Sequence, residues 1–184
     1  MPARSFRVGR SKTGLGLFAT REIPKGEIIV YYKGRIIPDK LARELENDTS
    51  NRYLYEINSR WTIDGSSRRN LGRYANHSCR PNAESDIRKH KVFIRATKKI
   101  APGDEITYDY GRDYFNAFLK PIGCLCDKCV EKRRAERAQK RKNAIAAKKR
   151  AATRARNLRA KARSKTRTKP RTAKKAGQGK KPRR

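Results

Sequence analysis

RYANHSCRPN, residues Arg73–Asn82, is the most informative run of residues in this chain. Asn, His, Ser and Cys in direct succession place hydrogen-bond donors, acceptors and a metal ligand on one turn. His77 has no serine or aspartate partner at a recognisable triad spacing, and a lone histidine is more often structural than catalytic. Taken alone, the run leaves both roles open for His77.

Three further cysteines follow Cys79 in the sequence CLCDKC, residues Cys124–Cys129. Thiols this close together suit one tetrahedral ion, because neighbouring thiolates converge without strain at a Zn–S distance of about 2.3 Å. They suit two disulfides poorly, and the thiols of an intracellular chain stay reduced. The spacing predicts a closed, structural metal site, with four unrelated buried or reactive cysteines as the alternative.

Two weaker motifs lie on either side of this run. Gly14-Leu15-Gly16 opens no βαβ unit, and tight turns explain most Gly-x-Gly sequences. Tyr108-Asp109-Tyr110-Gly111 by itself is typical of aromatic residues that fill a core strand. Neither motif identifies a function alone.

The first 129 residues carry the pattern of a strand-rich core. Short apolar, β-branched and aromatic runs predict strands at residues 27–33, 53–57, 61–64, 91–95 and 105–110. Residues 38–47 hold helix formers and end at an asparagine, which predicts one short helix. We therefore expect a mainly β fold with minor α.

One segment recurs within this core. Residues 19–27 read ATREIPKGE, and residues 96–104, which begin 77 positions later, read ATKKIAPGD. In both, a glycine turn precedes an acidic residue that opens a strand. Two copies are too few for a solenoid, so the similarity indicates either two turns of one type or a deeper symmetry.

The charge is divided unevenly along the chain. The 184 residues hold 50 Lys and Arg against 17 Asp and Glu, a formal net charge of +33. Residues 130–184 contribute 25 basic and 2 acidic side chains, or +23, and residues 1–129 the remaining +10. Trp61, all five Phe and all eight Tyr lie at or before Phe118. The charged tail cannot bury enough apolar surface to form a second globular domain.

The positive charge of the tail predicts a negatively charged partner. Arg, Lys and Ala dominate it, so counterion release would drive binding to DNA or RNA without base selection, because no aromatic side chain is present for stacking. We expect a disordered or helical tail; the alternatives are a solvated arm without a partner and a tail whose own lysines are methylated. No apolar run is long enough for a membrane span and no secretory signal is visible, so we expect a soluble, intracellular protein.

Together and in this order, these motifs resemble the SET-domain protein lysine methyltransferases. The residues that carry the resemblance are Gly14–Gly16, Tyr32–Gly34, Tyr53–Tyr55, Arg73–Asn82 and Asp104–Gly111. The cysteine cluster that follows resembles the family's post-SET zinc knot, although the spacing C-x-C-x₂-C is shorter than the C-x-C-x₄-C of many members. The resemblance implies a SET domain at residues 5–115, a post-SET segment at 116–130 and a basic tail at 131–184. It also implies short β-clip-like sheets with a pseudo-knot.

The resemblance assigns roles to individual residues. It implies that S-adenosylmethionine is held by Asn76 and by backbone groups, with His77 not acting as a base. The full set of residues at cofactor-contacting positions is Gly14, Leu15, Gly16, Tyr53, Asn76 and His77. Tyr110 would be the catalytic residue, and Tyr32, Tyr55 and Tyr108 would line the lysine channel. Zinc would be held by Cys79, Cys124, Cys126 and Cys129.

The implied function is methyl transfer from S-adenosylmethionine to a lysine of a histone or histone-like protein. A tyrosine at the position of Tyr108 implies a monomethyl product. We expect a monomer, located in a bacterial cytoplasm or nucleoid or in a eukaryotic nucleus or chromosome. The alternative is a non-catalytic, nucleic-acid-binding zinc protein with a SET-like core.

Overall fold

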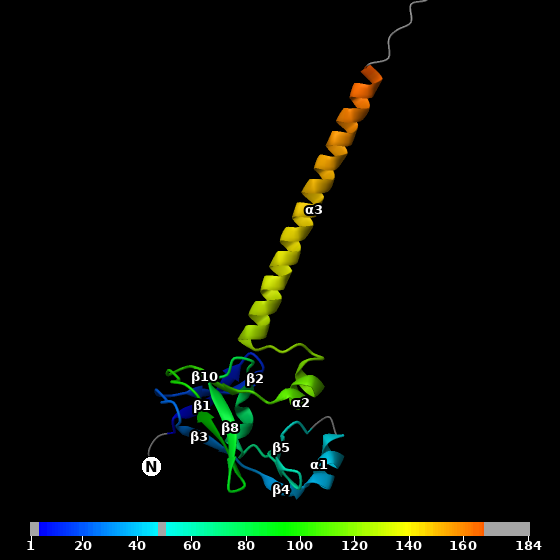
Figure 1. The fold of residues 1–184 in the computed structure, drawn as a ribbon. Coiled ribbons are helices and arrows are strands. Elements are labelled where there is room, and N and C mark those ends of the chain that lie inside the picture. Colours follow the sequence, from blue (N-terminus) through cyan, green and yellow to red (C-terminus); the bar gives the residue numbers. More distant parts are fainter. Residues whose placement is uncertain (1–3, 48–50, 168–184) are drawn as a thin grey trace, which may run out of the picture. The chain divides into compact units, whose positions relative to one another are not determined.

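The computed structural model describes residues 4–47 and 51–167. The chain divides into two units, Met1–Arg133 and Arg134–Arg184, which are described separately. Within the described part of the first unit, ten short strands form three small sheets (Figure 1). This is the mainly β architecture with minor α that the sequence predicts.

Each sheet is built from short and mostly antiparallel strands. The first contains, in spatial order, β1 (Phe6–Ser11), β2 (Gly14–Ala19), β10 (Glu105–Tyr108) and β7 (Asn76–His77). The second contains β3 (Ile28–Tyr32), β9 (Lys91–Ala96) and β8 (Ala83–Arg88), and the third β4 (Arg35–Pro38), β6 (Trp61–Asp64) and β5 (Leu54–Asn58). Helix α1 (Asp39–Glu46) lies beside β4. The pairing of β7 with β10 is parallel and places His77 opposite Tyr108.

The five predicted strands are all present, and two are shorter than expected: the run predicted at residues 27–33 is a strand only over Ile28–Tyr32. The run predicted at residues 105–110 ends as a strand at Tyr108, because its partner β7 has only two residues. Tyr110 therefore follows the strand, one residue before Gly111, which has a φ of +88°. The predicted short helix is α1, and its bounds differ from the expected range by one residue at each end.

The two copies of the recurring segment pair with each other around a pseudo-twofold axis. Ile23 and Ile100, equivalent positions of the two copies, exchange backbone hydrogen bonds of 3.0 and 2.9 Å. Both side chains are fully buried. The axis passes between these two residues, so the similarity is a symmetry of the fold and more than a shared turn type.

The contacts further from the axis obey the same symmetry. The N–H of Ala19 donates to the carbonyl of Asp104 at 2.9 Å, and the equivalent N–H of Ala96 donates to Glu27 at 3.0 Å. The flanking strands follow suit, since β2 pairs with β10 and β3 pairs with β9. The two segments thus form the centre of the unit.

The main core surrounds this centre. Its fully buried side chains come from strands of the first two sheets and from both copies of the segment, among them Leu17, Ile94 and Ile106. A smaller cluster of Tyr32, Ile63 and Val92 lies beside Tyr55 and Ile57. Tyr74 and Tyr110 pack against the main core from its border.

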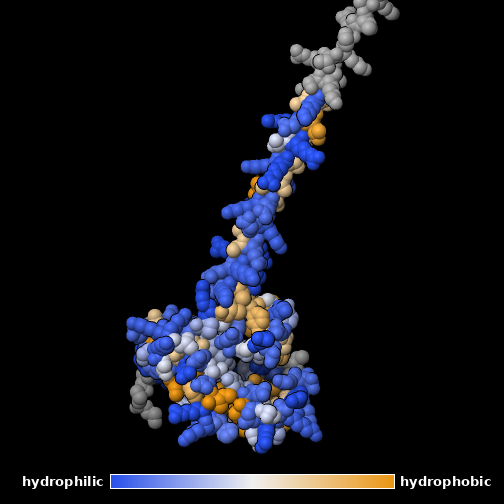
Figure 2. Space-filling model, viewed as in Figure 1, coloured by the Kyte–Doolittle hydropathy of each residue, from blue (hydrophilic) through white to orange (hydrophobic). Residues whose placement is uncertain are grey.

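The second unit is helical over its described part. Helix α3 (Asp127–Arg167) begins in the first unit and continues through the basic segment. In Figure 2 hydrophilic side chains dominate the surface of this helix. Of the two states expected for the tail, disordered or helical, the structure therefore shows the helical one as far as Arg167. Residues 168–184 lie outside the described part. No helix of the described residues is both long and apolar enough to cross a bilayer.

Candidate active site

Tyr110 is held at both ends by the segment that contains Asn76 and His77. Its hydroxyl donates a 2.8 Å hydrogen bond to the carbonyl oxygen of Ala75, and its backbone N–H donates to Nδ1 of His77 at 3.2 Å. The ring centroid of Tyr108 lies 4.8 Å from that of Tyr110. The hydroxyl of Tyr110 therefore has a fixed position at the border of the core.

Two further tyrosines lie close together in the smaller core cluster. The ring centroids of Tyr32 and Tyr55 are 5.5 Å apart. The Tyr32 hydroxyl donates to the carbonyl oxygen of Tyr53 at 2.9 Å, and the Tyr55 hydroxyl donates to Oγ of Ser85, also at 2.9 Å. Burial raises the pKa of Tyr32, Tyr55, Tyr108 and Tyr110 above the ordinary value for tyrosine. All four hydroxyls are therefore neutral at physiological pH, which is the form in which Tyr32 and Tyr110 donate to backbone carbonyls.

The aromatic cluster extends beyond the residues predicted from the sequence. Tyr114, at the end of α2 (Arg112–Tyr114), meets the ring of Tyr110 edge-on at 4.9 Å and 87°. Phe118, in the π-helical segment η2 (Phe115–Leu119), lies 4.8 Å from Tyr114. Tyr110, Tyr114 and Phe118 recur every four residues, and this helical spacing is the signal that could have revealed them.

The Gly-x-Gly motif lies directly beside Asn76. The side-chain amide of Asn76 donates to the carbonyl of Leu15 at 3.0 Å and to Oε1 of Glu105 at 2.7 Å. A Cβ on Gly16 would lie 2.5 Å from that Glu105 oxygen and 3.1 Å from the Asn76 amide nitrogen, so a larger residue would displace the Glu105 carboxylate from Asn76. The motif forms strand β2, not a tight turn, and Gly14 begins it with a φ of +119°.

Tyr53 occupies a different part of the site from these residues. The guanidinium of Arg73 stacks on its ring at 3.6 Å. The Nε of Arg73 is buried and has no hydrogen-bond partner within the described part of the chain. An acceptor group on a bound ligand would satisfy this donor.

A polar cleft of about 370 Å³ lies along the face that carries Asn76. It is bordered by residues 11–13 of the β1–β2 hairpin, by Asn76–Ser78, by residues of β10 and by the segment 125–128. Basic side chains at its rim are Lys12, Arg80, Lys98, Lys99 and Lys128. The volume and the mixture of amide, carboxylate and ammonium groups fit a nucleoside-sized ligand that carries both charges, as S-adenosylmethionine does.

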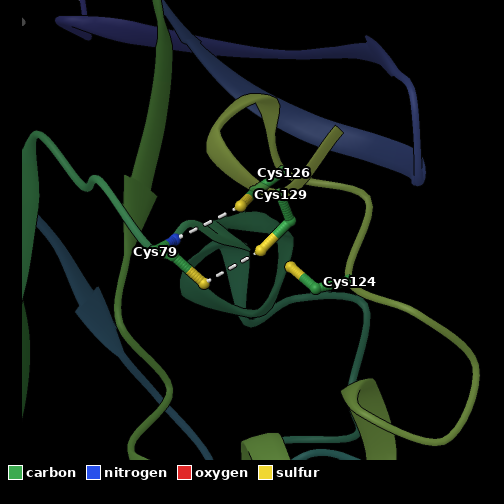
Figure 3. A group of neighbouring side chains, drawn as sticks. All are labelled: Cys79, Cys124, Cys126 and Cys129. Carbon is green, nitrogen blue, oxygen red and sulfur yellow. Dashed lines mark hydrogen bonds between the residues drawn. The ribbon is translucent and has the colours of Figure 1, made fainter. Parts of the chain in front are cut away.

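The four cysteines meet at one point in space (Figure 3). Cys79 follows β7, Cys124 and Cys126 precede α3, and Cys129 lies in its first turn. Their four sulfur atoms lie within 4.8 Å of one another, and the Sγ atoms of Cys79 and Cys129 are 3.6 Å apart. Tetrahedral zinc at about 2.3 Å from each thiolate needs sulfurs roughly 3.8 Å apart, so this donor set fits the ion.

The thiols differ in how readily they ionise. Burial opposes ionisation of Cys126, but hydrogen bonds from the backbone of Cys79 and Cys129 outweigh it and lower its pKa to about 7. Burial raises the pKa of Cys124 to about 11 and also raises that of Cys79. A divalent cation among them would stabilise all four thiolates.

Comparison with known proteins decides the family. The SET domain family matches residues 14–111, more than half of the chain. This chain belongs to the SET domain family. The match contains the Gly-x-Gly motif, the run Arg73–Asn82 and the Tyr108–Gly111 motif.

Relatives of this SET domain are named as histone-lysine methyltransferases. The chain is 34% identical over 124 residues to the histone-lysine N-methyltransferase trithorax of Drosophila virilis, which covers 63% of this chain and 3% of trithorax. It is 36% identical over 128 residues to the histone-lysine N-methyltransferase trr of Drosophila melanogaster, and the match covers 65% of this chain and 5% of trr. It is 34% identical over 146 residues to the putative histone-lysine N-methyltransferase ASHH4 of Arabidopsis thaliana, and the match covers 74% of this chain and 41% of ASHH4. The chain thus spans less than half of each of these proteins.

A solved structure shares the fold of this SET domain. A humanized mutant of the Chaetomium thermophilum Polycomb Repressive Complex 2, bound to an inhibitor, matches with a TM-score of 0.54 and 28% sequence identity. The match covers 60% of this chain and 15% of that one. The similarity confirms the SET-domain fold predicted from the sequence motifs.

Proposed function

We propose that this protein is an S-adenosylmethionine-dependent protein-lysine N-methyltransferase. The observation that carries the proposal is the fixed Tyr110 hydroxyl, which lies among neutral tyrosines next to the Gly-x-Gly and Asn-His motifs of a SET domain. Relatives named histone-lysine N-methyltransferases support it. S-adenosylmethionine would supply an electrophilic methyl group from its sulfonium.

The tyrosines would prepare the substrate lysine for attack. Only the neutral amine is nucleophilic, and a free lysine has a pKa near 10.4. A channel lined by Tyr32, Tyr55 and Tyr108 would desolvate the ammonium form and so favour loss of its proton. Tyr110 would then orient the amine nitrogen, whose lone pair forms the new N–C bond while the S–CH₃ bond breaks. The product forms directly as a methylammonium ion, because the positive charge passes to nitrogen, and the leaving group is a neutral thioether.

Tyr108 would set the product specificity. Its buried hydroxyl is neutral, so it can hold a water molecule in the space that additional methyl groups would need. We assign monomethyl-lysine as the main product on this basis.

The cysteine cluster would hold a structural zinc ion. Four thiolates leave no open coordination position for chemistry, so the ion would fix the post-SET segment, residues 116–130, next to Asn76–Ser78. The SET domain itself would comprise residues 5–115, and residues 131–184 would form the basic tail.

The substrate is assigned to histones or histone-like basic proteins, in the nucleus or on a nucleoid. The names of the relatives support a histone, including one from Schizosaccharomyces pombe that is named as specific for H3 lysine 4. The tail, with a net charge of +23, would bind DNA or RNA and so bring the protein to chromatin-like substrates.

Transfer of a labelled methyl group tests the function directly. Full-length protein and its Tyr110→Phe variant would be incubated with labelled S-adenosylmethionine and with core histones or a bacterial histone-like protein. We expect label on lysine for the wild type and a strong reduction for the variant. Binding of the cofactor by calorimetry without any transfer to either class of protein would instead support a non-catalytic SET-like core.

A further inference from the structure

The ring of His77 lies between the cysteine cluster and Tyr110. Its Nε2 is 3.2 Å from Sγ of Cys79, and its Nδ1 is 3.2 Å from the backbone nitrogen of Tyr110. The side chain is only 5% exposed. It also packs edge-on against the ring of Tyr110 at 5.4 Å and lies 5.6 Å from that of Phe115.

These contacts define the position of the ring proton. The N–H of Tyr110 can only donate, so Nδ1 of His77 must accept and carries no proton. In the neutral ring the proton is therefore on Nε2, which lies 3.2 Å from Cys79 Sγ. Oδ1 of Asp109 lies 3.6 Å from Nδ1, beyond hydrogen-bond distance, and accepts the N–H of Gly111 at 3.0 Å.

We propose that His77 is a positioning residue whose ring links Cys79 of the metal-binding cluster to the backbone of Tyr110 and thereby holds the catalytic tyrosine in register with the cluster. The proposal rests on the proposed function, in which Tyr110 touches the reacting amine. In this proposal the side chain of His77 positions Tyr110, whereas the family resemblance implies that this residue contacts the cofactor.

The second anchor of Tyr110 strengthens this link. Its hydroxyl is bound to Ala75, two residues before His77 in the same short segment that ends in Cys79. The tyrosine is thus pinned at its backbone by His77 and at its hydroxyl by Ala75. A shift of Cys79 would move both anchors together.

The acceptor at the other end of the ring is a strong one. A metal-bound cysteine is a thiolate, and hydrogen bonds to an ionised acceptor are shorter and stronger than those between neutral groups. Groups that hydrogen-bond to metal ligands in this way are typically worth about 10- to 100-fold in metal affinity or activity. The ring geometry of His77 is suited to such a role because both nitrogens are engaged and the ring is enclosed.

Nitrogen NMR on the zinc-loaded full chain tests the first half of the proposal. Long-range ¹H–¹⁵N correlations report which ring nitrogen carries the proton. We expect His77 to be protonated at Nε2 alone. The exposed His90, which has a φ of +59° in the β8–β9 turn, is the other histidine of the chain and serves as an internal reference. A proton on Nδ1 of His77 would overturn the proposal.

Exchange of the metal tests the second half. Replacing zinc with cadmium lengthens the metal–sulfur bonds and should shift the backbone amide resonance of Tyr110 in the wild type. In the His77→Phe variant, which keeps an aromatic ring but neither hydrogen bond, this shift should disappear. The amide of Thr107, which donates to Asn82 in the same region, is the reference signal. An equal shift in both proteins would contradict the link.

Kinetics separate positioning from cofactor binding. We expect His77→Phe to lower kcat by about 10- to 100-fold, with one zinc per chain retained and the KM for S-adenosylmethionine within about twofold. The matched His90→Phe variant should leave all values unchanged. A raised KM with an unchanged kcat would assign the His77 side chain to the cofactor. If no methyl transfer is found at all, the NMR experiments still decide the link, because they need no activity.

Discussion

The hydroxyl of Tyr110 donates its hydrogen bond to the carbonyl of Ala75, the residue immediately before Asn76. The side chain of Tyr110, which follows β10, is thereby anchored to the residue that precedes the Asn-His pair. Catalysis by alignment requires such a fixed group, since small displacements of a reacting group cost large factors in rate.

Tyr110→Phe should remove turnover while the fold and cofactor affinity persist. The hydroxyl is lost, but the ring can keep its contacts with Tyr108 and Tyr114. We expect kcat to fall by about 100-fold, the scale for misplacing a reacting group by about 1 Å. The lost hydrogen bond should lower the free energy of unfolding by about 1 kcal/mol.

The control is Tyr31→Phe, which alters a half-exposed tyrosine that packs on Phe93. It should change neither kcat nor the free energy of unfolding measurably. Single-turnover kinetics measure the rate of methyl transfer, and urea unfolding measures the stability. Comparable rates for Tyr110→Phe and the wild type would mean that another residue carries the chemistry.

Tyr108→Phe should shift the product from monomethyl-lysine towards di- and trimethyl-lysine. Tyr108 is 8% exposed and its ring lies against Tyr110, so loss of its hydroxyl would free space for methyl groups next to the amine. Mass spectrometry of the modified substrate counts the methyl groups. Abundant trimethyl product from the wild type would refute the assignment of Tyr108.

The reaction rate should rise with pH without a descending limb below about pH 10. Burial raises the pKa of Tyr108 and Tyr110, so both hydroxyls stay protonated throughout this range. The substrate amine loses its proton as the pH increases, so kcat/KM should grow about tenfold per pH unit well below the lysine pKa of about 10.4.

Initial rates between pH 6.5 and 9.5, with circular dichroism to verify folding at each pH, provide the measurement. A loss of rate below pH 9 in folded protein would show that a tyrosine hydroxyl ionises within the working range.

Gly26→Ala and Gly103→Ala should destabilise the protein by equal amounts. Both glycines have a φ of +88°, no atom lies within 4 Å of the added Cβ in either case, and the pseudo-twofold axis relates the two turns. Backbone strain alone then decides the cost, about 1–2 kcal/mol for each substitution.

Urea unfolding of the two variants gives the comparison, and Lys25→Ala in the first turn is the control, expected to stay within about 0.5 kcal/mol of the wild type. Costs that differ by more than about 1 kcal/mol would mean that the two turns are not energetically equivalent.

Substitution of tail residues should reduce the salt dependence of DNA binding. Lys148, Lys149 and Arg150 are exposed on α3. Changing all three to glutamine should lower the slope of log K against log salt by up to about 2.7, because each phosphate contact contributes about 0.9. A matched triple change of Arg88, Lys89 and Lys91, exposed at the β8–β9 turn, should leave the slope nearly unchanged. Fluorescence anisotropy at several salt concentrations measures the slopes, and equal slopes for both variants would exclude the helix as the binding element.

The sequence predicted those parts of the fold whose signal is local. The apolar runs at Ile28–Tyr32 and Lys91–Ala96 are strands because their own residues favour strands and are buried. The four cysteines meet as their spacing predicts. Strand β8, with the sequence AESDIR, was missed because its residues are largely polar and partner pairing stabilises it.

The parts that were missed depend on residues distant in the sequence. Strand β2 contains two glycines, which are unfavourable in strands, yet the Glu105 carboxylate lies close to Gly16 in the folded chain. The bond between the Tyr110 hydroxyl and Ala75 joins residues 35 positions apart, and no motif spacing predicts it. The role of Tyr114 was missed because its neighbours are set by the π-helical turn that follows it.

The mutual pairing of residues 19–27 and 96–104 imposes an order on biosynthesis. When the first copy leaves the ribosome, the strands that pair with β3 and with the open edge of β2 have not been made. At about 5–20 residues per second, the 77 residues between the copies take about 4–15 s to synthesise. Throughout that time the nascent chain presents unpaired strand edges, which are the surfaces most prone to aggregation. The centre of the domain can close only after residue 104 has emerged, so early translation of this protein is the stage at which a chaperone would have most effect.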